Sequence, residues 1–450
     1  MSDLLSIGRS GVLAYREALA AVGENVVNAD TDGYSRRQVT LKEQAVGAGP
    51  TMLSRNSAGL NGVQSASVSR VWDQYKAANA WSANSDSAYA DTRAQWLGTI
   101  QTGLDDSDAG VGVKLTSVFT TASQLAANPS DATLRQSMLF ALGDAASAIG
   151  RTGSNLSKAA DTLADNANTV VGQVNDALQT LTKINIALKT SPANSAGRAQ
   201  LEDQRDALIS TISSNVGVDV TFDANGAVSL KLNDYSGPQL LSSDSTTVPL
   251  LGLQRAGDGR LSLTMTSNGS STVQPITSGV LAGMADASVT LADRRRQVDD
   301  LANTLTTQIN SWNAQGLLAN GSPGGALMTG TTAATIAVAT SDTDAIAAGS
   351  ATSDNGNLTA ITDLRDGAGV EAKWRAISTD QALLVASAQT QATAAAAQKN
   401  SAAASADSVS GVNLDNEAAD LLRYQQAYSA SAKIIQTARD TLQTILDIIH

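Results

Sequence analysis

Cysteine and histidine, which many catalytic and metal-binding sites require, are almost missing from this chain. Its 450 residues include no cysteine and one histidine, His450, at the final position. A terminal residue frays, so it is a poor catalytic base. A Ser-His-Asp triad, a Cys-His pair and an HExxH zinc site are therefore impossible within one chain. We predict no catalytic, metal-binding or cofactor-binding residues, no cofactor and no enzymatic activity.

Two local patterns resemble ion-binding sites, and both have a simpler interpretation. The acidic run at 257–260 lacks the spaced oxygen ligands and the bidentate glutamate of a calcium loop, so we interpret it as a hairpin turn. Three consecutive arginines occupy 294–296 in an otherwise acidic chain. We expect these arginines to be solvated or paired with nearby carboxylates, with a partner-docking patch as the alternative. The carboxylates are those of Asp293, Asp299 and Asp300.

Composition excludes further classes of function. The chain carries 30 Lys and Arg against 42 Asp and Glu, a net charge of −12, which argues against nucleic-acid binding because phosphate binding needs concentrated basic residues. Only 3% of residues are aromatic, which favours thin, helix-rich layers. We find neither a basic segment leading into an apolar signal sequence nor a run of 18 apolar residues. We therefore expect no membrane insertion and, if the protein leaves the cell, export without a cleaved signal peptide.

The element most able to organise the chain is its last helix. Apolar residues recur every seventh position from Leu414 to Ile449, and a companion track four residues on runs from Ala418 to Leu446. Such a repeat over five heptads is typical of a helix that packs against another helix. The residues that we predict to form this C-terminal assembly face are Leu414, Leu421, Leu422, Tyr424, Tyr428, Ile435, Leu442 and Ile449. The remaining companion positions are Gln425, Ala432 and Arg439.

A second amphipathic helix is predicted over residues 3–27. Its companion track includes Gly8 and Ala29 beside the apolar positions. A long seam at each end of one chain makes pairing of the two termini the economical hypothesis; the alternative is that each helix packs on the nearest body domain. The predicted N-terminal assembly seam consists of Leu5, Val12, Tyr15, Leu19, Val22 and Val26.

Between the termini the pattern predicts a mainly α protein with a β-rich insert. Alternating apolar residues on both sides of Asn225 and Gly226 indicate a β-hairpin. We expect three domains: paired coiled-coil helices from 1–35 and 412–450, an elongated helical-bundle body, and one outer β-rich domain. The body comprises 36–215 and 285–411 with a small extended subregion at 316–370, and the β domain comprises 216–284.

Motifs at both ends carry a family resemblance. The first helix is followed by a turn with the pattern Asn-x-x-Asn-x-x-Thr-x-Gly-Tyr-Ser-Arg, and residues 410–438 read SGVNLDNEAADLLRYQQAYSASAKIIQTA. Together they resemble the flagellar rod, hook and filament axial protein family. The chain departs from the usual motifs at Asp30, Asp32, Arg37 and Asn416. The turn-motif residues are Asn25, Asn28, Thr31, Gly33, Tyr34, Ser35 and Arg36.

The resemblance implies a function for the chain. It implies a structural adaptor that polymerises as a ring at the distal end of the hook and joins hook to filament, through terminal helices that order on assembly. The implied partners are further copies of the chain, the hook protein, hook-associated protein 3, and an export chaperone on the C-terminal helix. The implied location is extracellular, on the bacterial flagellum.

Two alternatives stay open at this point. Flagellin and hook-associated protein 3 belong to the same family, although the Gly-Tyr-Ser-Arg turn and the Arg-Tyr-Gln-Gln-Ala-Tyr segment argue against both. From another class, the chain is a secreted helical adhesin or binding module that uses the insert at 216–284.

Overall fold

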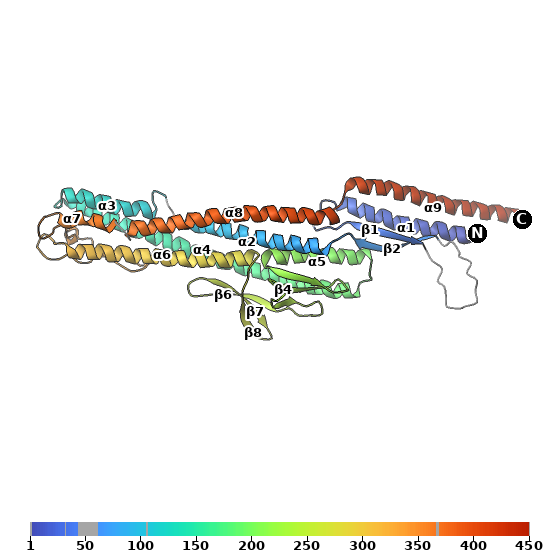
Figure 1. The fold of residues 1–450 in the computed structure, drawn as a ribbon, viewed down its shortest axis with the longest axis horizontal. Coiled ribbons are helices and arrows are strands. Elements are labelled where there is room, and N and C mark those ends of the chain that lie inside the picture. The colour runs from blue at the N-terminus through green and yellow to red at the C-terminus, as the bar shows by residue number, and fades with distance from the viewer. Residues whose placement is uncertain (1, 32, 44–61, 105–106, 366–368, 450) are drawn as a thin grey trace. The chain divides into compact units, whose positions relative to one another are not determined.

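The computed structural model describes residues 2–31, 33–43, 62–104, 107–365 and 369–449 (Figure 1). The chain divides into two compact units. Unit 1 comprises Met1–Asn84, Asn175–Pro249 and Ala397–His450, and unit 2 comprises Ser85–Val174 and Leu250–Ala396. This division differs from the three predicted domains, which stay a prediction.

Long helices make up most of both units, and this confirms the mainly α fold class. The α-helices are α1 (Ser2–Val27), α2 (Gln74–Leu104), α3 (Val111–Ala127), α4 (Ala132–Thr190), α5 (Ala196–Asn215), α6 (Val280–Gln315), α7 (Gly356–Ala360), α8 (Val370–Ser410) and α9 (Leu414–Ile449). Two short 3-10 helices are η1 (Thr343–Ala345) and η2 (Ile361–Arg365).

The strands form small antiparallel sheets. They are β1 (Arg37–Glu43), β2 (Val63–Arg70), β3 (Val218–Phe222), β4 (Val228–Leu232), β5 (Gln239–Leu241), β6 (Leu250–Arg255), β7 (Leu261–Ser267), β8 (Ser270–Gln274), β9 (Met328–Thr329) and β10 (Ala337–Val338). The sheet orders are β1-β2, β3-β4-β5, β6-β7-β8 and β10-β9.

Local sequence explains where the longest helix begins and ends. The carboxylate of Asp131 accepts hydrogen bonds from the backbone N–H groups of Thr133 and Leu134, at 2.7 and 3.2 Å, and so caps the start of α4. No proline interrupts its 59 residues, and Pro192 follows just after its end. α4 is therefore one continuous helix from Ala132 to Thr190.

Unit 2 has a core of large apolar side chains from its helices. Phe119 on α3, Leu142 and Ile149 on α4, and Leu305 on α6 are at most 2% exposed. A polar link lies among them, because the buried Gln381 of α8 donates to the backbone carbonyl of Leu97 and accepts from Arg294 Nε, at 2.8 and 3.0 Å. Arg294 is thus buried.

The arginine triplet was expected to be solvated or paired with nearby carboxylates, and Arg294 departs from that expectation. Arg294 is 5% exposed and packs inward, whereas Arg296 pairs with Asp293 at 2.5 Å on the surface. The side chains differ because consecutive positions on a helix point in different directions, so a triplet cannot share one environment.

The predicted hairpin at Asn225 and Gly226 is confirmed. β3 and β4 pair antiparallel from Val218 opposite Leu232 to Phe222 opposite Val228, and Gly226 takes the positive φ of 73° that the turn requires. The acidic run at 257–260 is the turn between β6 and β7, as predicted. The strands within 216–284 form two separate three-stranded sheets: β3-β4-β5 belongs to unit 1 and β6-β7-β8 to unit 2.

Among the described residues, none of the helices combines the length and the apolar character that crossing a bilayer requires.

Candidate assembly site at the terminal helices

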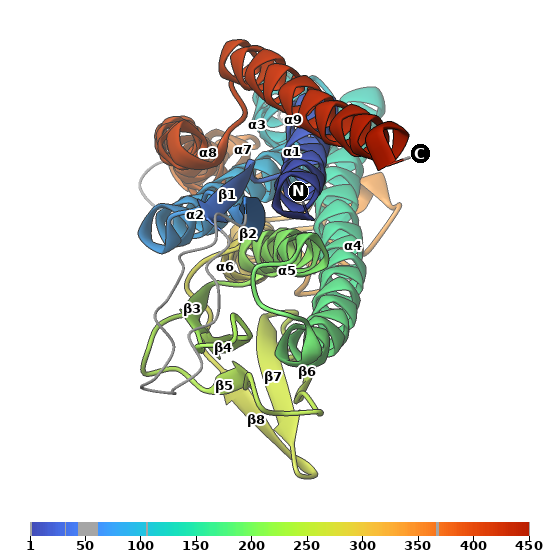
Figure 2. The same ribbon diagram turned by 90° about the vertical axis from the view of Figure 1, so that its right-hand side faces the viewer.

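The first and last helices pack against each other within unit 1, which confirms the predicted pairing of the termini (Figure 2). Asn25 near the end of α1 meets Glu417 near the start of α9, and Gly8 near the start of α1 meets Ile435. The two helices are therefore antiparallel.

Small residues line the α1 side of the contact. A Cβ atom added at Gly8 would lie 2.6 Å from Ile435 Cγ1, and one added at Gly11 would lie 3.0 Å from Ser431 Cβ. The contact at Gly8 is closer than real Cβ atoms show, and a Cβ atom at Gly11 would also clash with Ser431 Oγ, so both positions favour glycine. The buried residues of this row are Gly8, Gly11, Ala14, Ala18, Ala21, Val22 and Asn25. The helices approach closely and bury little apolar surface.

On α9, the row that faces α1 differs from the predicted companion track. The predicted positions Ala418, Gln425, Ala432, Arg439 and Leu446 are exposed. The row against α1 lies one residue earlier, at Glu417, Tyr424, Ser431 and Ala438. In a heptad repeat, the second inner position lies either three or four residues after the first. Here it lies three residues after, and because positions 417 and 431 are polar, the pattern of apolar residues does not reveal this.

The structure places the predicted seam residues at the margins of the contact. Leu5, Val12, Tyr15 and Leu19 are half-buried, Val22 is buried and Val26 is 41% exposed. On α9, Leu421, Tyr424, Tyr428 and Ile435 are half-buried. Leu414, Leu422 and Leu442 are exposed, and the side chain of Ile449 lies outside the described part of the structure. The assignment of these residues as an assembly seam stays a prediction.

Large apolar side chains remain on the outer surface of the pair. On α1, Leu4 and Leu13 are 49% and 50% exposed; on α9, Leu422 and Leu446 are 59% and 54% exposed. Large exposed apolar patches on proteins mark surfaces that bind other molecules.

The turn motif meets the helix pair through Asn25, which is 1% exposed. Its Nδ2 donates to the Arg37 carbonyl at 2.9 Å and to Glu417 Oε2 at 3.0 Å. Its Oδ1 accepts from the Arg37 N–H at 2.7 Å and from the Tyr34 hydroxyl at 2.8 Å. We call Asn25, Tyr34, Arg37 and Glu417 the Asn25 hub.

The other motif residues shape the turn itself. Asn28 Nδ2 donates to the Glu24 carbonyl and Asn28 Oδ1 accepts from Thr31, which closes the end of α1. Gly33 takes a positive φ of 77°, where a side chain would be strained. The Arg36 N–H donates to the Ser410 carbonyl, so this turn is tied to the end of α8.

Arginine–carboxylate pairs connect the hub to α5. Arg37 Nη2 lies 2.6 Å from Asp203 Oδ2, and Arg70 lies 2.8 Å from Asp203 and 2.6 Å from Asp206. The Arg37 and Arg70 side chains are only 5% and 4% exposed. Breaking such a pair leaves an uncompensated buried charge, so the pairs hold the β1–β2 hairpin firmly on α5.

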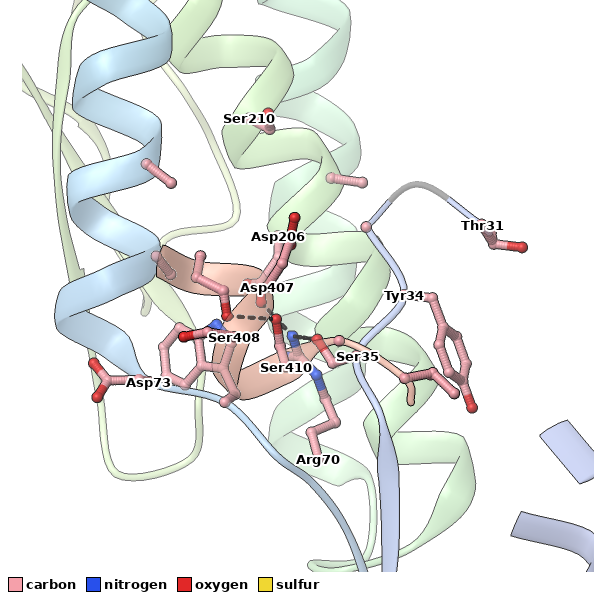
Figure 3. Close-up of a pocket in the computed structure, with 18 of the residues that line it drawn as sticks. Thr31, Tyr34, Ser35, Arg70, Asp73, Asp206, Ser210, Asp407, Ser408 and Ser410 are labelled. Atoms are coloured by element: carbon pink, nitrogen blue, oxygen red, sulfur yellow. Dashed lines mark hydrogen bonds and ion pairs between the residues drawn. The ribbon is translucent and has the colours of Figure 1, made fainter. Parts of the chain in front are cut away.

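A cavity of about 710 Å³ lies beside the turn motif (Figure 3). Its wall includes Tyr34 and Ser35, the start of α2, part of α5 and the connection from α8 to α9. Arg70 lies between Ser35 and Asp206 in Figure 3, with hydrogen bonds of 2.9 and 2.6 Å to them. The Arg70 guanidinium therefore already has partners within the chain, and its bonds to Ser35 and Asp206 help to hold the cavity wall in place.

Burial dominates the electrostatics of the hub tyrosine. Burial raises the pKa of Tyr34 to about 12, and the guanidinium of Arg37, 5.2 Å from the ring, opposes this shift only in part. Tyr34 therefore stays protonated and continues to donate to Asn25. Among the described residues, no group of three or more His, Cys, Asp or Glu is placed to hold a metal ion.

Sequence reasoning missed Glu417 and the role of Arg37. Glu417 is 2% exposed and 392 positions from its partner Asn25, so no local pattern announces the contact. One signal in the sequence could have indicated it: Glu417 is an acidic residue in a row of α9 whose later members are small or aromatic. The motif marks Arg37 only as a departure from the usual turn.

Comparisons with known proteins agree on one group. The family model of the flagellar hook-associated protein FlgK helical domain matches residues 97–328, and that of the flagellar basal body rod FlgEFG protein C-terminal region matches 403–448. Flagellar hook-associated protein 1 of Bacillus subtilis is 24% identical, with 98% of this chain and 97% of that protein aligned.

Two further similarities cover less of each chain. The protein of the same name from Salmonella typhimurium is 26% identical over 72% of this chain and 59% of its own length. The solved structure of the flagellar hook junction protein FlgK from Burkholderia pseudomallei is 24% identical, covers 56% of this chain and 46% of that chain, and has a TM-score of 0.49.

Proposed function

The chain belongs to the flagellar hook-associated protein FlgK family, whose helical-domain model matches more than half of it, and we propose that it is a structural adaptor joining the flagellar hook to the filament. In this role the terminal helix pair is the element that assembles. Copies form a ring at the distal end of the hook, in contact with the hook protein on one side and hook-associated protein 3 on the other.

The observation that carries this proposal is the unequal burial of the two faces of the helix pair. Its inner face is filled by Gly, Ala and Ser, whereas leucines such as Leu13 and Leu422 stay more than 49% exposed on the outside. Covering apolar surface contributes about 25 cal/mol per Å² before ordering costs. Neighbouring subunits therefore supply association energy that the pair does not obtain within one chain.

The small apolar area buried between α1 and α9 also has a consequence for export. A helix pair with little buried apolar surface does not repay its ordering entropy, so we propose that residues 1–30 and 415–450 are largely unfolded in the free monomer. Such a chain leaves the cell without a cleaved signal peptide and orders on the flagellum. Hydrogen exchange on the free protein is expected to show little protection in both segments; strong protection there contradicts this part of the proposal.

The main test is a gene deletion in the source bacterium. Cells that lack the protein are expected to build hooks and to shed filament subunits into the medium, and the wild-type gene is expected to restore filaments. Replacing Leu422 by Asp should prevent this restoration, because Leu422 lies on the outer face of the pair. The control is Leu383→Asp, an equally exposed leucine (64%) on α8 in unit 2, which should restore filaments. Normal filaments in the deletion strain contradict the proposal.

An export chaperone on the C-terminal helix is a further part of the proposal. Its contact face includes Leu421 and Leu422 together with Tyr428 and Ile435. The double change Leu421→Asp with Ile435→Asp should abolish both chaperone binding in a pull-down and assembly in cells. Retention of both activities contradicts this assignment.

A binding module at 216–284 makes a different prediction, but deleting the segment does not isolate it. Val228, Leu230 and Leu232 of β4 are 0% exposed and belong to the core of unit 1. Charge substitutions on β8, where Val273 is 57% exposed, are the cleaner test. An adaptor with Val273→Lys is expected to assemble normally.

A further inference from the structure

Antiparallel pairing of α1 with α9 leaves its register poorly defined by shape alone. Tyr424, whose ring centroid lies 6.3 Å from that of Tyr15, is the one large apolar side chain in the row of α9 that faces α1. The rest of the contact is between Gly11, Ala14 and Ala18 of α1 and the small residues at 431 and 438 of α9. Such small side chains provide few knobs and holes to distinguish one alignment from the next. In a ring, moreover, every subunit presents the same two helices. Something else must select the alignment and the partner.

Asn25 has the properties of a register-determining residue. A neutral amide has two N–H donors and a carbonyl oxygen that accepts two hydrogen bonds. All four are used: the donors by the Arg37 carbonyl and Glu417, the acceptor sites by the Arg37 N–H and the Tyr34 hydroxyl. An aspartate cannot donate to Glu417, and an alanine leaves the buried carboxylate without this partner.

The partner on α9 is equally constrained. Glu417 is 2% exposed, and its second oxygen lies 3.8 Å from Arg36 Nη1. Sliding α9 by one heptad would place Tyr424 opposite Asn25 and would remove Glu417 from both groups. A buried donor and a buried carboxylate would then lack partners, which is far costlier than the loss of one hydrogen bond in water.

We propose that the Asn25–Glu417 hydrogen bond sets the register of the terminal helix pair and selects α9 as the partner of α1. The inference rests on the proposed function, in which this pair is the assembling element, and names the residues that determine its specificity. Buried polar contacts between helices have this effect in coiled coils. Arg37 connects the same hub to α5, because its backbone bonds to Asn25 and its side chain pairs with Asp203.

The absence of cysteine permits a direct measurement by disulfide trapping. Gly11→Cys with Ser431→Cys reports the native register, because the two Cβ atoms lie 3.0 Å apart and a shift of roughly 0.5 Å brings them to the separation found in disulfides. Gly11→Cys with Ala438→Cys reports a register shifted by one heptad and is the matched control. Oxidation of the full-length protein traps whichever register forms, however briefly, and the yield ratio of the two disulfides is measured by gel electrophoresis.

The expected ratio strongly favours the native disulfide when Asn25 is present. Adding Asn25→Ala should lower the ratio by at least about tenfold, the effect of an unpaired buried polar group. Glu417→Leu, a change on the other helix, should do the same. Glu417→Gln keeps an acceptor for Asn25 and should leave the ratio within about twofold.

Two outcomes overturn the inference. One is a ratio that stays within about twofold of the parent when Asn25→Ala or Glu417→Leu is added. The other is a loss with Glu417→Gln as large as that with Glu417→Leu, which would show that the carboxylate charge and not the hydrogen bond sets the register. Failure of the adaptor role is separate, since it appears as normal filaments in the deletion strain whatever the disulfide ratio.

Discussion

The terminal helix pair and the helical core of unit 2 use the same secondary structure and opposite packing. In unit 2, Phe119, Leu97 and Met138 are at most 2% exposed, and the contact faces are built from large side chains. In the pair, the contact is built from Gly8, Gly11 and three alanines of α1, while leucines point outward.

This difference separates a self-sufficient fold from a conditional one. Burying a Leu or Phe side chain contributes about 1.5–3 kcal/mol, so a core of many such residues is stable within one chain. A face of Gly and Ala contributes much less, and its specificity comes from one polar hub. We therefore expect the body of the molecule to fold alone, and we propose that the pair depends on its neighbours.

The largest expected effect comes from removing a ring from the unit 2 core. Phe119→Ala should lower the free energy of unfolding by about 3–5 kcal/mol, because it leaves a cavity that the core cannot close. The measurement is urea unfolding followed by circular dichroism. Phe140→Ala is the matched control: Phe140 is 65% exposed, so its loss should cost less than about 0.5 kcal/mol. Equal losses would remove the contrast between core and surface.

The second prediction concerns the buried ion pairs that connect the β1–β2 sheet to α5, and whether they stabilise the fold as strongly as the core of unit 2 does. Arg70→Met should destabilise unit 1 by about 3 kcal/mol, because Asp203 and Asp206 would lose a buried partner. The control is Arg255→Met, whose pair with Asp161 is 2.8 Å long but exposed, and the expected cost is about 0–1 kcal/mol. Thermal unfolding of both variants checks this. A cost for Arg70→Met no larger than that of the control would assign the ion pairs to the weakly held part of the molecule.

A third prediction concerns the close approach of the helices. Gly11→Ala should weaken the pair by about 1–3 kcal/mol, because its new Cβ meets Ser431. Gly23→Ala on the same helix meets nothing within 4 Å and should strengthen α1 by up to about 1 kcal/mol. Trimethylamine oxide titration, followed by helix content, should shift in opposite directions for the two variants. Shifts in the same direction would show that glycine is not required by the contact.

The smallest expected effect is a loss of stability at alkaline pH. The pKa of Tyr34 in the folded protein is raised to about 12, above the ordinary value of about 10, so folding favours the protonated phenol. Its contribution to stability is present below pH 10 and is lost as pH rises through about 12. Comparing wild type with Tyr34→Phe by thermal unfolding between pH 9 and 12, in trimethylamine oxide to favour the paired termini, should show a steeper loss in the wild type. Parallel curves would exclude Tyr34 as the cause.

Much of this architecture follows from local sequence. Capping residues and proline mark the limits of α4, Asn225 and Gly226 mark a hairpin, and sevenfold repeats mark both terminal helices, because each signal depends on a few neighbouring residues. The resemblance in the turn motif also led to Asn25 and Tyr34, two members of the hub. The division of the insert into two sheets did not follow, since its short strands carry no signal of which unit they join.

The sequence by itself determined that the two ends are amphipathic helices suited to pairing and that the chain has no cysteine and a single, terminal histidine. Only the tertiary structure decided which row of α9 faces α1, that glycines set the distance between them, and that Asn25 meets Glu417. The physical reason is range. Helix periodicity is a local property, whereas the partner of a buried amide is chosen by every residue that brings two distant segments together.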